Sequence, residues 1–65
     1  MNRRVLKDEK FHIIGYIEED NNGKQVLKDE KFHIRGYYDP KTNVTKDERF
    51  HIVGYGNLLT NLLDD

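Results

Sequence analysis

The sequence predicts an all-β protein made of three tandem β-hairpin repeats, about six short antiparallel strands, with a short leucine-rich helical segment at its C-terminal side. The first observation is a repeat: Val5 to Ile13 recurs unchanged as Val26 to Ile34, and with two substitutions as Val44 to Ile52. Each copy continues through one variable position to Gly-Tyr, so the repeat units span 5–16, 26–37 and 44–55. Repetition of this kind indicates adjacent copies of one supersecondary unit.

Within each unit the pattern predicts strand, turn and strand. Val-x-Lys-Asp is a short strand, Asp-Glu-Lys or Asp-Glu-Arg supplies a charged turn, and Phe-His-Ile-x-Gly-Tyr alternates bulky apolar with polar residues as a second strand does. Alternation places Phe, Ile and Gly of each unit on one face, which we expect to be the core, and His and Tyr on the other. The glycine is expected to permit close backbone approach, to mark a bulge, or to end the strand.

The connectors between units, 17–25 and 38–43, differ in length and contain residues that favour turns. Asn22-Gly23 suits the positive φ angles of a tight hairpin turn. In the second connector Pro40 presets φ and Asn43 tolerates the left-handed region. Both connectors are therefore predicted to reverse the chain between strands.

The C-terminal segment, 56–65, departs from the repeat and carries four leucines. On a helix they span one arc of about 140°, with Asn57 as the expected N-cap and Asp64-Asp65 at the unfavourable end of the helix dipole. So short a helix must dock on the sheet of its own chain or of a neighbour. We predict an oligomer interface formed by Leu58, Leu59, Leu62 and Leu63.

Length and composition favour one small domain, 1–65, that gains stability by self-association. A chain of 65 residues buries only about 60% of the surface that it exposes when unfolded, and the absence of cysteine excludes disulfides. With 12 acidic and 11 basic residues interspersed, no global field attracts nucleic acid or anionic membrane. No apolar run reaches the roughly 20 residues of a membrane span, and Met1 to Arg4 do not begin a signal peptide. A cytoplasmic homo-oligomer is expected.

The segment Tyr38 to Asp47, together with Ile52 to Leu59, resembles small bacterial proteins built of Gly-aromatic β-hairpin repeats, the four-fold β-flower group among them. The resemblance covers most of the chain and implies a fold, with no activity or catalytic residue. The chain departs from that group in having three units instead of four. It also has Phe11, Phe32 and Phe50 where the turns of that group carry glycine in an Asp-x-x-Gly element.

The equivalent histidines and tyrosines of the three units form the possible ligand face: His12, His33, His51, Tyr16, Tyr37 and Tyr55. Three imidazoles brought together could bind zinc, or titrate in mild acid and so control association, but repetition alone also explains their recurrence, and we assign no metal and no cofactor. The tyrosines, with lysines and arginines nearby, could stack the bases of single-stranded nucleic acid, or pack between hairpins.

No residue set supports an enzyme. The paired carboxylates, such as Asp8-Glu9, lie in turns beside Lys or Arg, and an exposed turn supplies little of the desolvation that acid/base catalysis needs to shift a pKa. Serine and cysteine are absent, which leaves no nucleophilic triad. We therefore expect a non-enzymatic module that acts through self-association and protein binding, with binding of single-stranded nucleic acid or of a metal or ligand at the histidines as the alternatives.

Overall fold

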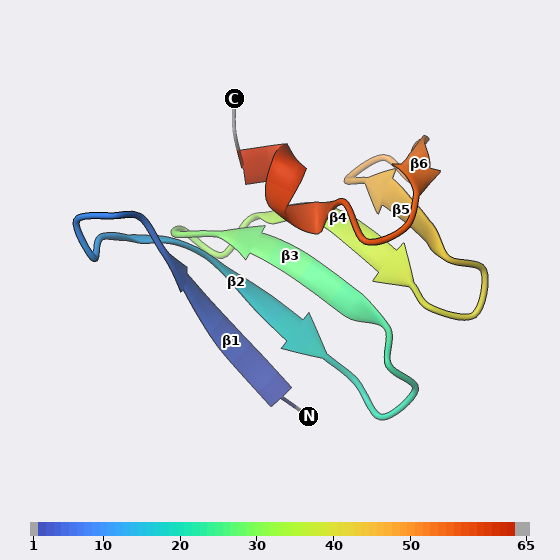
Figure 1. Cartoon of the computed structure of the whole chain (residues 1–65), viewed down its shortest axis with the longest axis horizontal. Coiled ribbons are helices and arrows are strands. Elements are labelled where there is room, and N and C mark those ends of the chain that lie inside the picture. Colours follow the sequence, from blue (N-terminus) through green and yellow to red (C-terminus); the bar gives the residue numbers. More distant parts are fainter. Residues whose placement is uncertain (1, 64–65) are drawn as a thin grey trace.

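A computed structural model describes residues 2–63 as one six-stranded antiparallel sheet with a short helix on one face (Figure 1). The strands follow one another in the sheet in chain order, each antiparallel to the next. The elements are β1 (Asn2–Lys7), β2 (Ile13–Glu19), β3 (Gln25–Asp29), β4 (Ile34–Asp39), β5 (Val44–Asp47), β6 (Ile52–Tyr55) and the 3-10 helix η1 (Leu59–Leu63). The predicted all-β fold with six strands and a short C-terminal helix is confirmed.

The turn inside each hairpin is organised by an aspartate. Asp8 Oδ1 accepts hydrogen bonds from the backbone N–H groups of Lys10 and His12, both at 2.9 Å. The N–H of Phe11 donates to the Asp8 carbonyl at 3.0 Å, and Phe11 has a left-handed backbone with φ of 64°. The turns that begin at Asp29 and Asp47 have the same bonds. Hydrogen bonds from a side chain to the nearby backbone compete with strand pairing. Each turn therefore extends from the aspartate through the phenylalanine to the histidine.

Our prediction that the second strand of each unit begins at phenylalanine, and that phenylalanine belongs to the core, is therefore wrong. The strands begin at Ile13, Ile34 and Ile52. The phenylalanines lie in turns, outside the alternation of the strand, and Phe11, Phe32 and Phe50 are 80%, 49% and 62% exposed. The three isoleucines are exposed as well.

One extra residue interrupts the pairing within each hairpin. In the first hairpin, Leu6 pairs with Gly15 and the next residue, Lys7, pairs with Ile13. No residue of β1 therefore lies opposite Ile14. The same register shift recurs in the other two hairpins. A bulge bends its strand and increases the local twist, so each hairpin bends at the variable position of its repeat unit.

The connecting turns are shorter than predicted, because β2 and β4 continue into the expected connectors as far as Glu19 and Asp39. Asp20 organises the first connecting turn with the same bonds as Asp8, and Gly23 has the left-handed backbone there. Asn43 has the left-handed backbone of the second. The predicted reversals lie where expected.

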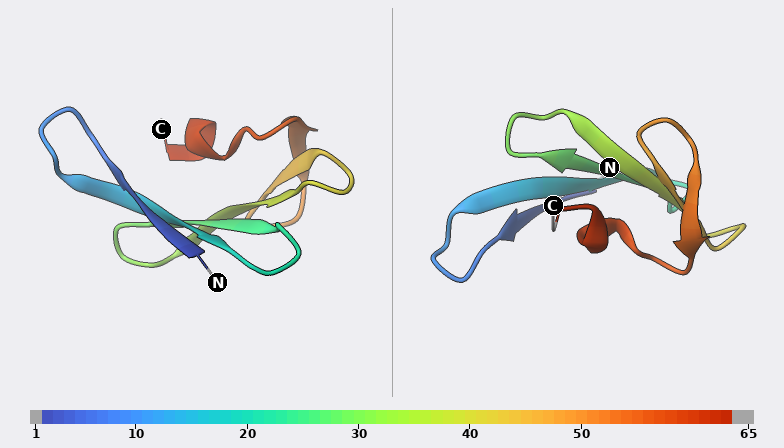
Figure 2. Two further views of the ribbon diagram at one scale, coloured as in Figure 1. Left: turned by 60° about the horizontal axis from the view of Figure 1, so that its bottom comes forward. Right: turned by 90° about the horizontal axis from the view of Figure 1, so that it is seen from above.

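The core lies between η1 and one face of the sheet. Both views of Figure 2 show η1 on that face. Leu59 is fully buried against Ile17 and Leu27. Gly36 makes room for this packing, since a Cβ there would collide with the Leu62 side chain and would lie 2.8 Å from the carbonyl oxygen of Lys46. Close approach, one of the expected roles of the repeated glycine, is therefore the role that Gly36 fulfils.

The segment before η1 is held by polar contacts. Thr45, fully buried, donates through Oγ1 to the Gly56 carbonyl at 2.6 Å and accepts from the Leu58 N–H at 3.0 Å. Asn57 Oδ1 accepts from the Leu59 N–H at 3.2 Å, in agreement with its predicted capping role. Asp64 and Asp65, expected at the end of this helix, lie outside the described residues.

Replacement of Leu59 by alanine should lower the free energy of unfolding by about 2–4 kcal/mol, because it removes the side chain that closes the core and leaves a cavity. Urea unfolding followed by circular dichroism measures the change. Thr60→Ala, an exposed substitution in the same helix, is the control and should leave stability nearly unchanged. Equal stability of the two variants would contradict this account of the core.

Candidate functional site

The face of the sheet opposite η1 carries the tyrosines of the repeat. The Cβ positions of Gly15 and Gly36 point at leucines of η1, and successive side chains of a strand alternate between faces. Tyr16 and Tyr37 therefore point away from the core. The prediction that tyrosine lies on the face opposite the core is consistent with this arrangement, although the core itself is made of other residues than expected.

Each of these tyrosines stacks on the phenylalanine of the next hairpin. The ring centroids of Tyr16 and Phe32 lie 4.6 Å apart with 8° between the ring planes. Those of Tyr37 and Phe50 lie 4.7 Å apart, also with 8° between the planes. The left-handed turn thus aims the phenylalanine ring at the neighbouring hairpin. We call Phe11, Tyr16, Phe32, Tyr37, Phe50 and Tyr55 the aromatic ladder.

Strand pairing places the tyrosines between aliphatic and cationic neighbours. Tyr16 is paired with Val5 on β1 and with Lys28 on β3. Tyr37 is paired in the same way with Val26 on β3 and Lys46 on β5. The face therefore repeats valine, tyrosine and lysine across the sheet, in register with the hairpins.

Charged groups border the first stack. The Arg3 guanidinium lies 5.7 Å from the Tyr16 ring centroid and 5.6 Å from that of Phe32, within the range of a cation–π interaction. Glu18 accepts from both Arg3 and Lys28 at 2.9 Å. The Lys28 hydrogen bond lowers the pKa of Glu18 more than partial burial raises it, and Arg3 lowers it further. The carboxylate thus bridges Arg3 and Lys28 beside the stack.

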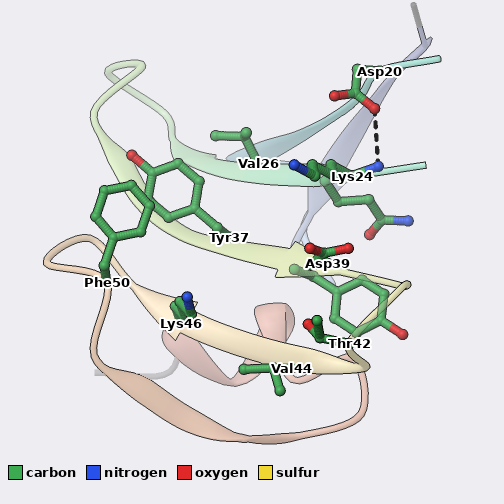
Figure 3. A pocket seen from close by; sticks show the side chains of 11 residues that line it. Asp20, Lys24, Val26, Tyr37, Asp39, Thr42, Val44, Lys46 and Phe50 are labelled. Carbon is green, nitrogen blue, oxygen red and sulfur yellow. Dashed lines mark hydrogen bonds between the residues drawn. The ribbon is translucent and has the colours of Figure 1, made fainter. Parts of the chain in front are cut away.

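A shallow cavity of about 360 Å³ lies beside the second stack. Figure 3 shows Tyr37 and Phe50 at one side of it and Lys24 at the other, with Val26 between them and Lys46 below the two rings. Lys24 is fixed by its backbone N–H, which donates to Asp20 Oδ1 at 3.0 Å. Asp20 and Asp39 also line the cavity, so its rim carries charges of both signs. An apolar centre with a polar rim is typical of a surface that binds another protein.

The histidines are not gathered at this face. His12, His33 and His51 lie in three separate turns, where the Nδ1 atom of each is 3.6, 3.6 and 3.8 Å from an Asp Oδ2 of its own turn. Within residues 2–63 no three His, Cys, Asp or Glu side chains are grouped so as to hold a metal ion. The hypothesis of three converging imidazoles is therefore not supported by the geometry.

The leucines predicted as an oligomer interface are used inside the chain. Leu59 is fully buried, and Leu62 and Leu63 pack against the same core cluster. Leu58 lies over Gly54, at 2.7 Å from a Cβ built there. Leu59 therefore has no surface left for a second copy. Of the two docking arrangements that the sequence left open, the structure shows docking on the chain's own sheet.

Sequence reasoning missed three features of the site. The sequence did contain a signal for the stacking role of the phenylalanines. In Asp-x-x-Phe, phenylalanine occupies a left-handed turn position that ordinarily holds glycine, which indicates that the ring has a role there. The repeated segment of the third unit, from valine to isoleucine, differs from that of the first at two positions, and Thr45 in place of Leu6 is one of them. This difference was the sequence signal for the role of Thr45. The position of Arg3 over the rings had no sequence signal.

Comparison of the chain with protein-family models, with curated proteins and with solved structures gave no match. Among the described residues, no helix has the length and apolar character needed to cross a membrane.

Phe11 and Phe32 have the same backbone but different surroundings, which gives a matched pair of variants. The left-handed backbone of a non-glycine residue costs about 1–2 kcal/mol. Phe11→Gly removes this cost and should raise the free energy of unfolding slightly. Phe32→Gly gives the same relief but loses the stack on Tyr16, so it should be less stable than Phe11→Gly by about 0.5–1.5 kcal/mol or more. Urea unfolding of both variants provides the comparison. A larger loss for Phe11→Gly would mean that the stack does not stabilise the sheet.

The turn aspartates should make stability depend on acid. Hydrogen bonds from the backbone N–H of His12, His33 and His51 are the largest cause that lowers the pKa of Asp8, Asp29 and Asp47, ahead of the opposing effect of burial. A carboxyl with a lowered folded pKa adds stability above its unfolded pKa, near 3.8 here, and loses it as pH falls through the folded value.

Thermal unfolding should therefore show the wild type losing stability as the pH falls below about 3.8. The variant with all three aspartates replaced by asparagine should lose less over the same range, because its amides do not titrate. Glu30→Gln, in the second of these turns, controls for the general effect of removing a carboxylate. Parallel acid profiles of wild type and triple variant would show that these bonds do not contribute.

Proposed function

We propose that this chain is a small non-enzymatic β-repeat module that acts through self-association and protein binding. The observation that carries the proposal is the large amount of apolar surface left open. The exposed large apolar side chains are Val5, Phe11, Ile13, Phe32, Ile34, Phe50, Ile52, Val53 and Tyr55. Exposed apolar side chains that gather in one region mark sites of interaction.

Six of these side chains, the phenylalanines and the isoleucines, are grouped by the topology. The three turns within the hairpins all lie at one end of the sheet, because consecutive antiparallel strands bring every second turn to the same end. Each of these turns exposes one phenylalanine, and an isoleucine follows at the start of the next strand. An apolar end of the sheet, continuous with the aromatic ladder, is therefore available to a partner.

The energetics favour association. The buried hydrophobic residues of the described chain are Ile17, Leu27, Val44 and Leu59, fewer than the large apolar residues that remain exposed. Removal of apolar area from water contributes about 25 cal/mol per Å². Covering the exposed apolar side chains would therefore add to the burial that so small a core provides.

The aromatic ladder suits a protein partner better than single-stranded nucleic acid. Base stacking needs free ring faces, whereas Tyr16 and Tyr37 each give one ring face to a phenylalanine. Glu18 also forms ion pairs with Arg3 and Lys28, the two cations beside the first stack. The net charge of −1 supplies no general attraction to phosphate.

The turn carboxylates support the non-enzymatic part of the proposal. Asp8, Asp29 and Asp47 accept backbone hydrogen bonds that build the turns, and their pKa values are lowered. A general acid at neutral pH requires a pKa raised toward 7. These carboxylates therefore have the properties of structural groups.

Light scattering across a micromolar to millimolar concentration series should give a molar mass that rises above the 7.8 kDa of one chain. The variant with Ile13, Ile34 and Ile52 replaced by threonine should need a higher concentration to associate, because it loses exposed apolar area while keeping β-branched residues. Asn61→Ala, on the exposed side of η1, is the control and should associate as the wild type does. A mass of one chain throughout the series would contradict the proposal.

A further inference from the structure

The junction between consecutive hairpins is built the same way at both places where it occurs. The second strand of one hairpin pairs with the first strand of the next, β2 with β3 and β4 with β5. A tyrosine of the first hairpin stacks on a phenylalanine of the second. The same tyrosine is paired with a lysine of the second, Tyr16 with Lys28 and Tyr37 with Lys46.

The two edge strands of the described sheet carry the two separate halves of this junction. At the β1 edge are Lys7 and Phe11, equivalent in the repeat to Lys28 and Phe32. At the β6 edge is Tyr55, equivalent to Tyr16 and Tyr37 and 75% exposed. Each edge thus offers what the other lacks, and the two edges are the first and last strands of one open sheet (Figure 1).

We propose that β6 of one copy pairs antiparallel with β1 of a second copy, with Tyr55 stacked on Phe11 of that copy. This inference rests on the proposed function and specifies one of the contacts through which self-association occurs. The occupant of each edge is a second copy of this chain, because the tyrosine–phenylalanine junction is already formed twice within one molecule.

The register of the new junction follows from the existing ones. Gly15 pairs with Asp29 and Gly36 with Asp47, which places Gly54 beside Asp8 of the second copy. Tyr55 then lies beside Lys7, as Tyr16 lies beside Lys28. The phenylalanine is three residues after the aspartate in every unit, so this register also brings Phe11 to Tyr55.

As far as residue 63, the C-terminal segment leaves this edge open. Gly56, with φ of 85°, turns the chain out of β6. Its N–H donates to the Asn43 carbonyl, and its carbonyl accepts from Thr45. Both partners lie on the side of β5, which is the paired side of β6. The chain then continues to η1 over β3 and β4, away from the free edge.

The contact is head-to-tail. A β6 edge against another β6 edge would bring two tyrosines together without a phenylalanine, and two β1 edges would bring together lysines without a tyrosine. A heterologous contact generates rings where the rotation closes and filaments where it does not. Each copy therefore has one donor edge and one acceptor edge.

Two variants that each block one edge test this arrangement. Phe11→Gly removes the ring at the β1 edge and keeps a residue suited to the left-handed turn. Tyr55→Lys places a lysine beside Lys7 of the second copy. Each variant alone should need about ten times the wild-type concentration to associate, as expected for loss of one aromatic pair. An equimolar mixture should form dimers at concentrations where each alone is monomeric, because one intact edge of each kind remains.

Light scattering and circular dichroism distinguish the outcomes. Thr60→Lys adds the same charge on the face covered by η1 and should associate as the wild type does. If the wild type associates and both edge variants associate equally well, the edge arrangement is overturned while the proposed function stands. A mixture that stays monomeric where each variant is monomeric also overturns it, since a symmetric contact would then be required. A monomeric wild type overturns both proposals.

Discussion

The packing of Leu59 against Ile17 and Leu27 is the contact on which the other features of this chain depend. A six-stranded sheet alone would leave both of its faces in water. The hydrophobic cluster forms because η1 packs on one of these faces. This packing requires glycine at positions 15 and 36, because a side chain at Gly15 or Gly36 would clash with leucines of η1 and with the backbone of the neighbouring strand. It also requires Thr45, whose hydroxyl holds the segment that leads into η1. Gly15, Gly36 and Thr45 thus serve the same contact.

The turn motif connects local strain to the order of the hairpins. A phenylalanine in the left-handed region is unfavourable by about 1–2 kcal/mol, and the aspartate side chain offsets part of this by capping two backbone N–H groups. In return the ring projects to the neighbouring tyrosine at stacking distance. A glycine would relax the turn but would remove this aromatic contact between adjacent hairpins. The phenylalanine therefore acts between hairpins, although it lies within one.

The number and order of strands could be predicted from the sequence because turn-forming residues punctuate it at every reversal, and the leucine spacing was enough to predict the helix. The strand boundaries and the core could not be predicted by alternation, since alternation treats Phe32 as a strand residue. Hydrogen bonds from Asp29 to the backbone override that pattern, and they are visible only once the turn geometry is known. The leucines could be predicted to dock, but whether they docked on their own sheet depended on the room left by glycine.

The two faces of the sheet solve different problems. The face under η1 gives a short chain a core, and it is closed by residues of that chain. The opposite face joins hairpin to hairpin through a junction that has a tyrosine half and a phenylalanine half. A row of such junctions in an open sheet always leaves one half at each edge, whatever the number of hairpins, and η1 covers neither edge. Edge strands with unpaired backbone groups are sites of association in general, and in this sheet the two edges are also complementary to each other.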